Sequence, residues 1–218
     1  MTDVKYGGSL KPTLTDVNVI GDDRRKGRMS RYEGDNSTAL RSQAWLAEAL
    51  EKLMLEKPYG RISVGDICAR AQLSRQTFYN MFGDKDEVLH YCLRSAYEER
   101  FRSICALDAV TIDDIVDGFV SVVESKRDVL KAMVDNRLTG IVFEEISACV
   151  ALFAGRFVRE DERTDLFPYS EAMLAGAIAQ MLVLWFQRDD SVGTDELASL
   201  LKDFMNGRVY QITSERKG

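Results

Sequence analysis

Six neighbouring residues in one short stretch carry side chains that could bind a charged or hydrogen-bonding partner. They lie in "LSRQTFYNMF" (residues 73–82) and are Ser74, Arg75, Gln76, Thr77, Tyr79 and Asn80. If the stretch is helical, their polar groups share about one and a half turns, while Phe78 and Phe82 turn inward as anchors. Gln and Asn amides pair with adenine, Arg pairs with guanine, and polar side chains bind phosphates. The pattern therefore indicates a surface suited to phosphates and base edges.

Two helix-start signals position this stretch. Ser63 precedes Asp66 by three residues, a spacing typical of a capping box, and it predicts a helix over residues 64–71. The letters "QLS" then form a turn, and Ser74 is placed to cap a second helix, which has room for about two turns before Gly83 ends it. Two short helices joined in this way predict a helix-turn-helix unit, whose second helix fits the major groove of DNA.

The rest of the chain is patterned almost entirely as helices. A first helix is expected from Ser37 to the stop "EKPYG", with an apolar stripe of Leu46, Ala49, Leu50, Leu53 and Met54. Further helices are expected at residues 84–105, 112–125, 128–135, 138–160 and 170–187, and a last one contains Leu197, Leu201, Phe204 and Met205. The fold class is therefore all-α, with about nine helices.

The same pattern divides the chain into three parts. Residues 1–36 have no amphipathic period and are interpreted as a flexible leader, residues 37–90 as the helix-turn-helix domain, and residues 91–218 as a helical regulatory and dimerisation domain.

The charge of the chain differs between these parts. The whole chain carries a net charge of −6, but residues 24–94 hold 13 Lys and Arg against 9 Asp and Glu, whereas residues 96–218 hold 14 against 22. A basic module on an acidic body fits a DNA-binding domain joined to a sensing or dimerising domain, although ordinary surface variation gives the same split. The basic segment "RRKGRMSR" (residues 24–31) is expected to enter a minor groove of DNA or to follow the DNA backbone. The alternative is a solvated tail without contact to DNA.

Several classes of function are disfavoured. The chain has no G-x-S-x-G, P-loop or G-x-G-x-x-G motif, so we expect no enzyme, no catalytic residue and no cofactor. The lone histidine, His90, lacks a partner at ligand spacing, so it receives no role and no metal site is expected. The four cysteines, Cys68, Cys92, Cys105 and Cys149, are interpreted as reduced core thiols. No membrane segment or signal peptide is recognised, so a cytoplasmic location is expected.

Residues 46–89 resemble the N-terminal domain of the TetR/AcrR family of transcriptional regulators. The most specific part of the resemblance is the spacing of Thr77, Phe78, Tyr79, Phe82, Lys85 and Leu89. The resemblance implies that phosphates are bound by Ser63, Thr77, Tyr79 and Lys85, and that Arg75, Gln76 and Asn80 are candidates for base contact. Pro58 stands where the family usually has glycine, and Asn80 and Met81 also depart from its pattern, so the base preference is not readable.

The resemblance also implies a function. It is that of a sequence-specific DNA-binding regulator of transcription, by family default a repressor released by a small-molecule effector. The alternative is a co-activator or protein-interaction module that keeps the fold and acts through another protein, because the stretch also resembles a branch of the family that includes the activator of bacterial dihydroxyacetone kinase operons.

The last two helices are expected to form a homodimer interface. The first of them has a bulky stripe, Leu174, Ile178, Met181, Leu182 and Trp185, and a row of small residues, Ala172, Ala175, Gly176 and Ala179. One face can serve the core and the other a partner, so Ala175 and Ala179 are predicted to lie at the closest contact between subunits. A two-fold dimer then predicts a palindromic operator, and a larger monomeric core is the alternative.

An effector pocket, if the body has one, is expected between the helices of residues 84–187. Its candidate residues are Tyr91, Phe101, Phe119, Met133, Phe143 and Cys149. The alternative is that these side chains only fill the core.

Overall fold

The computed structural model describes residues 37–107, 110–157, 165–188 and 192–208. Every regular element in these ranges is a helix, so the predicted all-α class is confirmed. The predicted leader and its basic letters at residues 24–31 lie outside the described residues.

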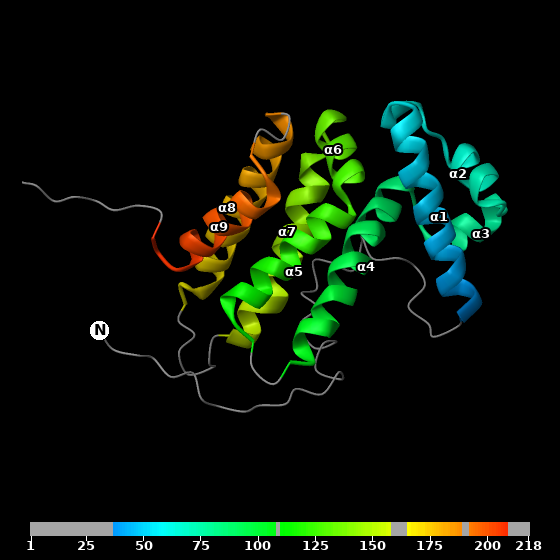
Figure 1. The fold of residues 1–218 in the computed structure, drawn as a ribbon. Coiled ribbons are helices and arrows are strands. Elements are labelled where there is room, and N and C mark those ends of the chain that lie inside the picture. Colours follow the sequence, from blue (N-terminus) through cyan, green and yellow to red (C-terminus); the bar gives the residue numbers. More distant parts are fainter. Residues whose placement is uncertain (1–36, 108–109, 158–164, 189–191, 209–218) are drawn as a thin grey trace, which may run out of the picture.

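The first helices form a small group at one end of the molecule (Figure 1). It consists of α1 (Ser37–Glu56), the 3-10 turn η3 (Tyr59–Arg61), α2 (Val64–Ala71) and α3 (Arg75–Met81). Leu46 and Leu50 of α1 are fully buried with Ile67 of α2, as the apolar stripe predicts. Because α2 and α3 are too short to be stable alone, this shared core and their N-terminal caps must hold them.

The remaining helices form the body, and α4 leads into it from the α1–α3 group (Figure 1). The body helices are α4 (Lys85–Cys105), α5 (Ile112–Ser125), α6 (Arg127–Asp135), α7 (Thr139–Phe157), α8 (Phe167–Gln187) and α9 (Thr194–Met205). Helix α8 packs chiefly against α7, and α9 packs against α5. Since α4 continues through residue 90, one rigid helix belongs to both parts of the molecule.

Helix α6 is bonded at both ends to the α1–α3 group. The Lys126 ammonium, at the start of α6, lies 2.6 Å from a carboxylate oxygen of Glu51 in α1. At its other end the Asn136 side-chain oxygen accepts a hydrogen bond of 2.8 Å from the backbone N–H of Tyr59. The body therefore contacts the α1–α3 group through α4 and through two polar contacts of α6.

Several predicted helix ends differ from the structure by one residue, and two differ in a way that the sequence explains. Helix α8 begins at Phe167 rather than near residue 170, because Pro168 occupies its first turn, where proline is favoured. Gly83 does not end α3 with a left-handed residue, since Phe82 leaves the helix in an extended conformation. The left-handed residue of this region is Gln72, with φ 55°, at the end of α2.

The prediction that Ala175 and Ala179 of α8 lie at the closest contact between subunits is wrong. Ala175 is 2% exposed and Ala179 is also buried, so both lie inside the subunit with the bulky stripe rather than on its surface. The small side chains of Ala175 and Ala179 let α8 approach its neighbours closely, whereas Ala172 is exposed. A different face of α8 is exposed, and Met173 on it is 76% exposed.

Helix α8 is also the one helix of the described residues whose length and hydropathy would suit a membrane span. A third of the apolar window is buried within the subunit. Core helices of non-membrane proteins can have the same length and hydropathy, and α8 packs against α7.

Candidate nucleic-acid interface

Helix α3 presents a polar face that is anchored from behind. Phe78 is fully buried, and so is Phe82 directly after the helix, which confirms the predicted anchors. Arg75, Gln76 and Asn80 are exposed on the opposite side. The two buried rings fix the rotation of α3 about its axis, and therefore determine which side chains point outward.

Hydroxyl groups organise the start of α3. The Ser74 oxygen accepts a hydrogen bond of 3.0 Å from the Thr77 backbone N–H, and the two hydroxyl oxygens lie 2.9 Å apart. Tyr79 is 47% exposed, and its ring meets Phe78 edge-on at a centroid distance of 5.4 Å. Contact with a buried aromatic limits where the tyrosine hydroxyl can point, so the outward face has defined geometry.

The N-terminus of α2 lies beside the same face. Ser63 caps it with a full capping box: its hydroxyl accepts from the Asp66 N–H at 3.2 Å, and the Asp66 carboxylate accepts from the Ser63 N–H at 2.8 Å. A side chain at Gly65 would come within 2.7 Å of an Arg75 guanidinium nitrogen and 3.5 Å of the Ser63 hydroxyl. Gly65 thus leaves room for the Arg75 guanidinium at a helix N-terminus, where an anion would be favoured.

Lys85 is held by the backbone rather than extended into solvent. Its ammonium donates to the Tyr59 carbonyl at 2.8 Å and to the Ile62 carbonyl at 3.0 Å, and lies 4.0 Å from the centroid of the Tyr59 ring. The Tyr59 hydroxyl in turn bonds the Asp86 carboxylate, and burial followed by this bond raises the pKa of Tyr59. Two of three ammonium protons are therefore used to hold η3, which leaves one for another acceptor.

The folded part of this domain has no excess of positive charge. Residues 37–92 contain the cations Arg41, Lys52, Lys57, Arg61, Arg70, Arg75 and Lys85, and the anions Glu48, Glu51, Glu56, Asp66, Asp84, Asp86 and Glu87. Arg70 pairs with Glu56 at 2.6 Å and Lys57 with Asp66 at 3.0 Å. The excess of positive charge counted over residues 24–94 therefore comes from the residues before α1 and from Arg94.

The structure reveals a buried polar cluster that the sequence analysis missed. His90 is buried, and its Nδ1 lies 2.7 Å from an oxygen of Glu145, which also accepts from Arg94 at 2.8 Å. The second oxygen of Glu145 accepts from the Tyr97 hydroxyl at 3.2 Å. The expectation that His90 has no role is therefore wrong: it joins α4 to α7. Glu145 is 48 to 55 residues away from Tyr97, Arg94 and His90 in the sequence, and no local spacing signals these contacts.

The charges in this cluster support one another. Burial alone would raise the pKa of Glu145, but the hydrogen bond from His90 and the charge of Arg94 outweigh it and lower that pKa. For Arg94, burial opposes the charged form, yet the charge of Glu145 and its hydrogen bond raise the pKa. The carboxylate is therefore ionised inside the protein, and since it can only accept, His90 Nδ1 is the donor.

The predicted pocket residues separate into two groups. Phe101, Phe119 and Cys149 line a pocket between α4, α5 and α7. Tyr91 instead contacts Phe82, Met133 is core, and Phe143 is exposed, so these three lie outside the pocket. Cys68 and Cys92 are buried and Cys149 half-buried, all three as free thiols.

The three-helix group with its capped α3 has the architecture of a DNA-binding helix-turn-helix domain. Residues 46–92 match the family model for bacterial regulatory proteins of the tetR family. Residues 46–92 are therefore similar to the DNA-binding domain of TetR-family transcriptional regulators, which confirms the resemblance for that stretch.

Individual proteins resemble parts of the chain or share its fold. The HTH-type dhaKLM operon transcriptional activator DhaS of Lactococcus lactis subsp. lactis (strain IL1403) is 34% identical over 71 residues, which span 33% of this chain and 38% of that relative. Two solved structures share the fold. The dihydroxyacetone kinase operon activator DhaS has a TM-score of 0.54 and 19% identity, and the match covers 78% of this chain and 97% of that chain. A TetR transcriptional regulator from Streptococcus agalactiae 2603V has a TM-score of 0.50 and 15% identity, and the match covers 77% of this chain and 94% of that chain.

Proposed function

We propose that the protein regulates transcription by binding a palindromic DNA site as a homodimer. The observation that carries this proposal is the polar face of α3, with Arg75, Gln76 and Asn80 exposed over the buried anchors Phe78 and Phe82. A face of this kind, on a helix short enough to lie in the major groove, suits base recognition.

The proposed roles of the side chains follow from their positions. Ser63, Thr77, Tyr79 and Lys85 bind phosphates, while Ser74 caps α3 and lies at its DNA-facing end. Gln76 and Asn80 read bases. Arg75 was assigned to a base from the sequence, and its position beside Ser63 and Gly65 equally suits a phosphate at the N-terminus of α2.

The proposed homodimer uses the exposed apolar faces of α8 and α9. The large side chains exposed on these helices are Tyr169, Met173, Leu184, Leu200 and Phe204. An exposed patch of this composition is expected to be covered by a second copy, because monomers in water rarely keep one. We divide the chain as expected from the sequence, with a leader at residues 1–36, the DNA-binding domain at 37–90 and the regulatory body at 91–218, and we place the protein in the cytoplasm.

The direction of regulation rests on two opposed arguments. Repression released by a small-molecule effector is the family default, whereas the Lactococcus relative is described as an operon activator. The pocket between α4, α5 and α7 supports an effector. We propose a regulator that responds to a ligand and acts either as a repressor or as an activator.

The test is binding to DNA fragments from upstream of the gene, measured by fluorescence anisotropy over a series of salt concentrations. We expect affinity to fall steeply with salt, because phosphate contacts release counterions. Arg75→Ala should weaken binding, and Arg70→Ala is the matched control, since Arg70 is already paired with Glu56 on the neighbouring helix. No binding together with a stable complex with another protein would favour the co-activator.

A further inference from the structure

The turn η3 between α1 and α2 is bonded to two helices of the body. It begins after Pro58, and the first backbone N–H groups of a helix find no acceptor within that helix. In η3 the first of these groups belongs to Tyr59, and it donates to the side-chain oxygen of Asn136, at the end of α6, at 2.8 Å. The carbonyl of Tyr59 accepts from the Lys85 ammonium of α4, also at 2.8 Å. One residue of η3 therefore joins α6 to the lysine that is assigned to a phosphate.

The Asn136 side chain is already held by its own helix. Its Nδ2 donates to the Ala132 carbonyl in the last turn of α6 at 2.8 Å, which assigns Oδ1 as the acceptor. The chain then reverses at Arg137, whose φ is 60°, and the Leu138 N–H bonds the Met133 carbonyl at 2.9 Å. These features close the helix in a Schellman motif. A side chain held in this way loses little conformational freedom when it accepts the N–H of η3.

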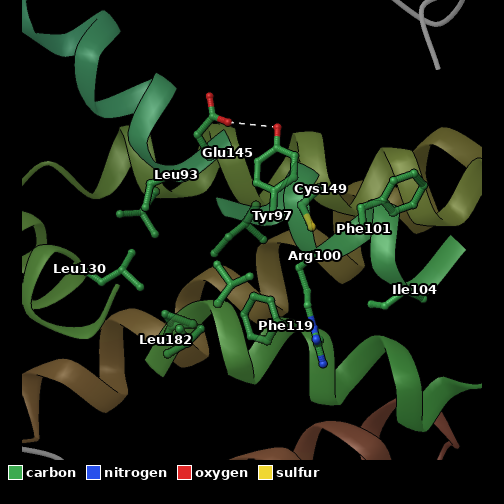
Figure 2. Close-up of a pocket in the computed structure, with 15 residues that line it drawn as sticks. Leu93, Tyr97, Arg100, Phe101, Ile104, Phe119, Leu130, Glu145, Cys149 and Leu182 are labelled. Carbon is green, nitrogen blue, oxygen red and sulfur yellow. Dashed lines mark hydrogen bonds between the residues drawn. The ribbon is translucent and has the colours of Figure 1, made fainter. Parts of the chain in front are cut away.

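Helix α4, which carries Lys85, is fixed to the body close to that residue. His90 lies between one and two turns after Lys85 and donates to Glu145 of α7 at 2.7 Å. Figure 2 shows a further bond of the same carboxylate, which accepts from the Tyr97 hydroxyl of α4. The backbone of Lys85 is therefore fixed relative to α7. Its flexible side chain is positioned instead by the groups that its ammonium meets.

The groups that the Lys85 ammonium meets belong to η3 and the residue after it. They are the Tyr59 carbonyl, the Ile62 carbonyl at 3.0 Å and the Tyr59 ring at 4.0 Å. Two donated protons fix the direction of the third, because an ammonium is tetrahedral. Ile62 is followed directly by Ser63, the cap of α2 and a second residue assigned to a phosphate. A displacement of η3 would therefore move Lys85 and Ser63 together.

We infer that Asn136 is a positioning residue for DNA binding: it holds the N–H of Tyr59 and so fixes η3, and η3 directs the remaining proton of Lys85 toward a DNA phosphate. The inference rests on the proposed function, because it takes Lys85 as a phosphate contact. Asn136 lies at the end of α6 in the body and acts through Tyr59 rather than by touching DNA. Its loss should weaken binding to all DNA sequences alike, since phosphates carry no base information.

Two substitutions separate the two hydrogen bonds of Asn136. Asn136→Ala removes both, whereas Asn136→Asp keeps an acceptor for Tyr59 but loses the donor to Ala132 and places a negative charge at a helix C-terminus, which is unfavourable. Affinity is measured at about 0.15 M salt, where charges more than about 8 Å apart are largely screened. We expect Asn136→Ala to weaken DNA binding about threefold to tenfold, the range of one hydrogen bond, and Asn136→Asp to bind like the wild type. Equal losses in both variants would show that only the helix cap matters and would overturn the inference.

A matched control and a double variant exclude a general loss of structure. Asn206 makes the same bond at the end of α9, to the Lys202 carbonyl at 2.7 Å, so Asn206→Ala should leave DNA affinity unchanged. In the Lys85→Ala background, Asn136→Ala should cost no further affinity, because both changes remove one phosphate contact. The full additional loss in the double variant would show that Asn136 acts independently of Lys85, which contradicts the inference.

NMR of the protein without DNA separates this inference from the proposed function. In Asn136→Ala the Tyr59 amide should exchange with solvent about tenfold faster, and the side-chain ammonium signal of Lys85 should broaden. If the wild type binds no DNA, the proposed function fails, while an unchanged Lys85 signal in this variant would by itself refute the positioning role. If the wild type binds DNA and Asn136→Ala binds it equally well, the inference fails and the proposed function stands.

Discussion

The α1–α3 group and the body of this molecule are both helical, yet their main polar clusters lie in opposite places. On α3 the polar side chains lie outside, and the anchors Phe78 and Phe82 are buried. In the body, Glu145 is inside and accepts hydrogen bonds from His90, Arg94 and Tyr97. The exposed polar side chains of α3 suit an external partner, whereas the buried cluster around Glu145 fixes α4 against α7.

The first prediction concerns the buried cluster around Glu145 and its contribution to the stability of the fold. Glu145→Ala leaves His90 and Arg94 without their shared acceptor, and removing one partner of a buried ion pair costs about 3–5 kcal/mol. The free energy of unfolding, measured by urea denaturation, should fall by that amount. Glu144→Ala is the control, because Glu144 is exposed and lies 3.7 Å from His90, and it should cost under about 1 kcal/mol. Equal losses would show that the buried cluster contributes no more than a surface pair.

The second prediction concerns the two faces of α8. Met173→Arg puts a charge on the exposed apolar face and should raise the dimer dissociation constant about a hundredfold, roughly 2.8 kcal/mol, with little change in subunit stability. Ala175→Arg instead forces a long charged side chain into the subunit core and should unfold it. Analytical ultracentrifugation and circular dichroism separate the outcomes. A Met173→Arg variant that remains as dimeric as the wild type would refute the proposed interface.

The third prediction sharpens the assignment of roles on the DNA-binding side. Gln76→Ala and Asn80→Ala should each cost about 1–3 kcal/mol at one base position and little elsewhere. Lys85→Ala and Tyr79→Phe should weaken binding to all sequences alike, since phosphate contacts carry no base information. Competition assays with single-base operator variants measure this, and a changed base preference in Lys85→Ala or Tyr79→Phe would contradict the assignment.

The fourth prediction concerns the segment before α1. Because residues 37–92 carry no net positive charge, residues 24–31 are expected to supply much of the salt dependence of the DNA affinity. Deleting residues 1–31 should lower affinity and flatten the slope of log K against log salt. An unchanged slope would leave this segment without a role in DNA binding.

The smallest expected effect is at the cap of α2. The backbone N–H of Ser63, then Lys57 and the Ser63 hydroxyl, lower the pKa of Asp66 to about 2. A lowered carboxyl pKa adds stability that is fully present above its unfolded value of about 3.9 and is lost as pH falls through the folded value. Asp66→Asn should remove this part of the pH dependence between about pH 4 and pH 2. An NMR titration of Asp66 with a midpoint near 3.9 would contradict the capping account.

These contrasts explain how much the sequence could predict. The caps Ser63 and Ser74 and the anchors Phe78 and Phe82 depend on residues three or four positions apart, so local spacing reveals them. The bounds of α2 and α5 were predicted to the residue for the same reason. The face of α3 follows from its anchors, although its contacts with DNA stay a prediction.

The missed features depend on contacts between distant residues. His90 meets Glu145 across 55 residues, and α6 meets Tyr59 across 77, which no spacing rule encodes. Ala175 and Ala179 were placed on the wrong face because α8 is apolar on two sides, and periodicity alone does not say which side meets α7. Lys85 was assigned to a phosphate, and only the fold shows the two carbonyl groups that its ammonium also binds.

Selection of binding sites from a pool of random duplex DNA tests the central claim most directly. The wild-type protein is predicted to enrich an inverted repeat whose half-sites are one helical turn apart or a multiple of it, roughly 34–36 Å for each turn, and Gln76→Ala should relax one position in each half-site. Enrichment of no sequence, or of a single unrepeated site, would contradict the account of a two-fold dimer that reads DNA through α3.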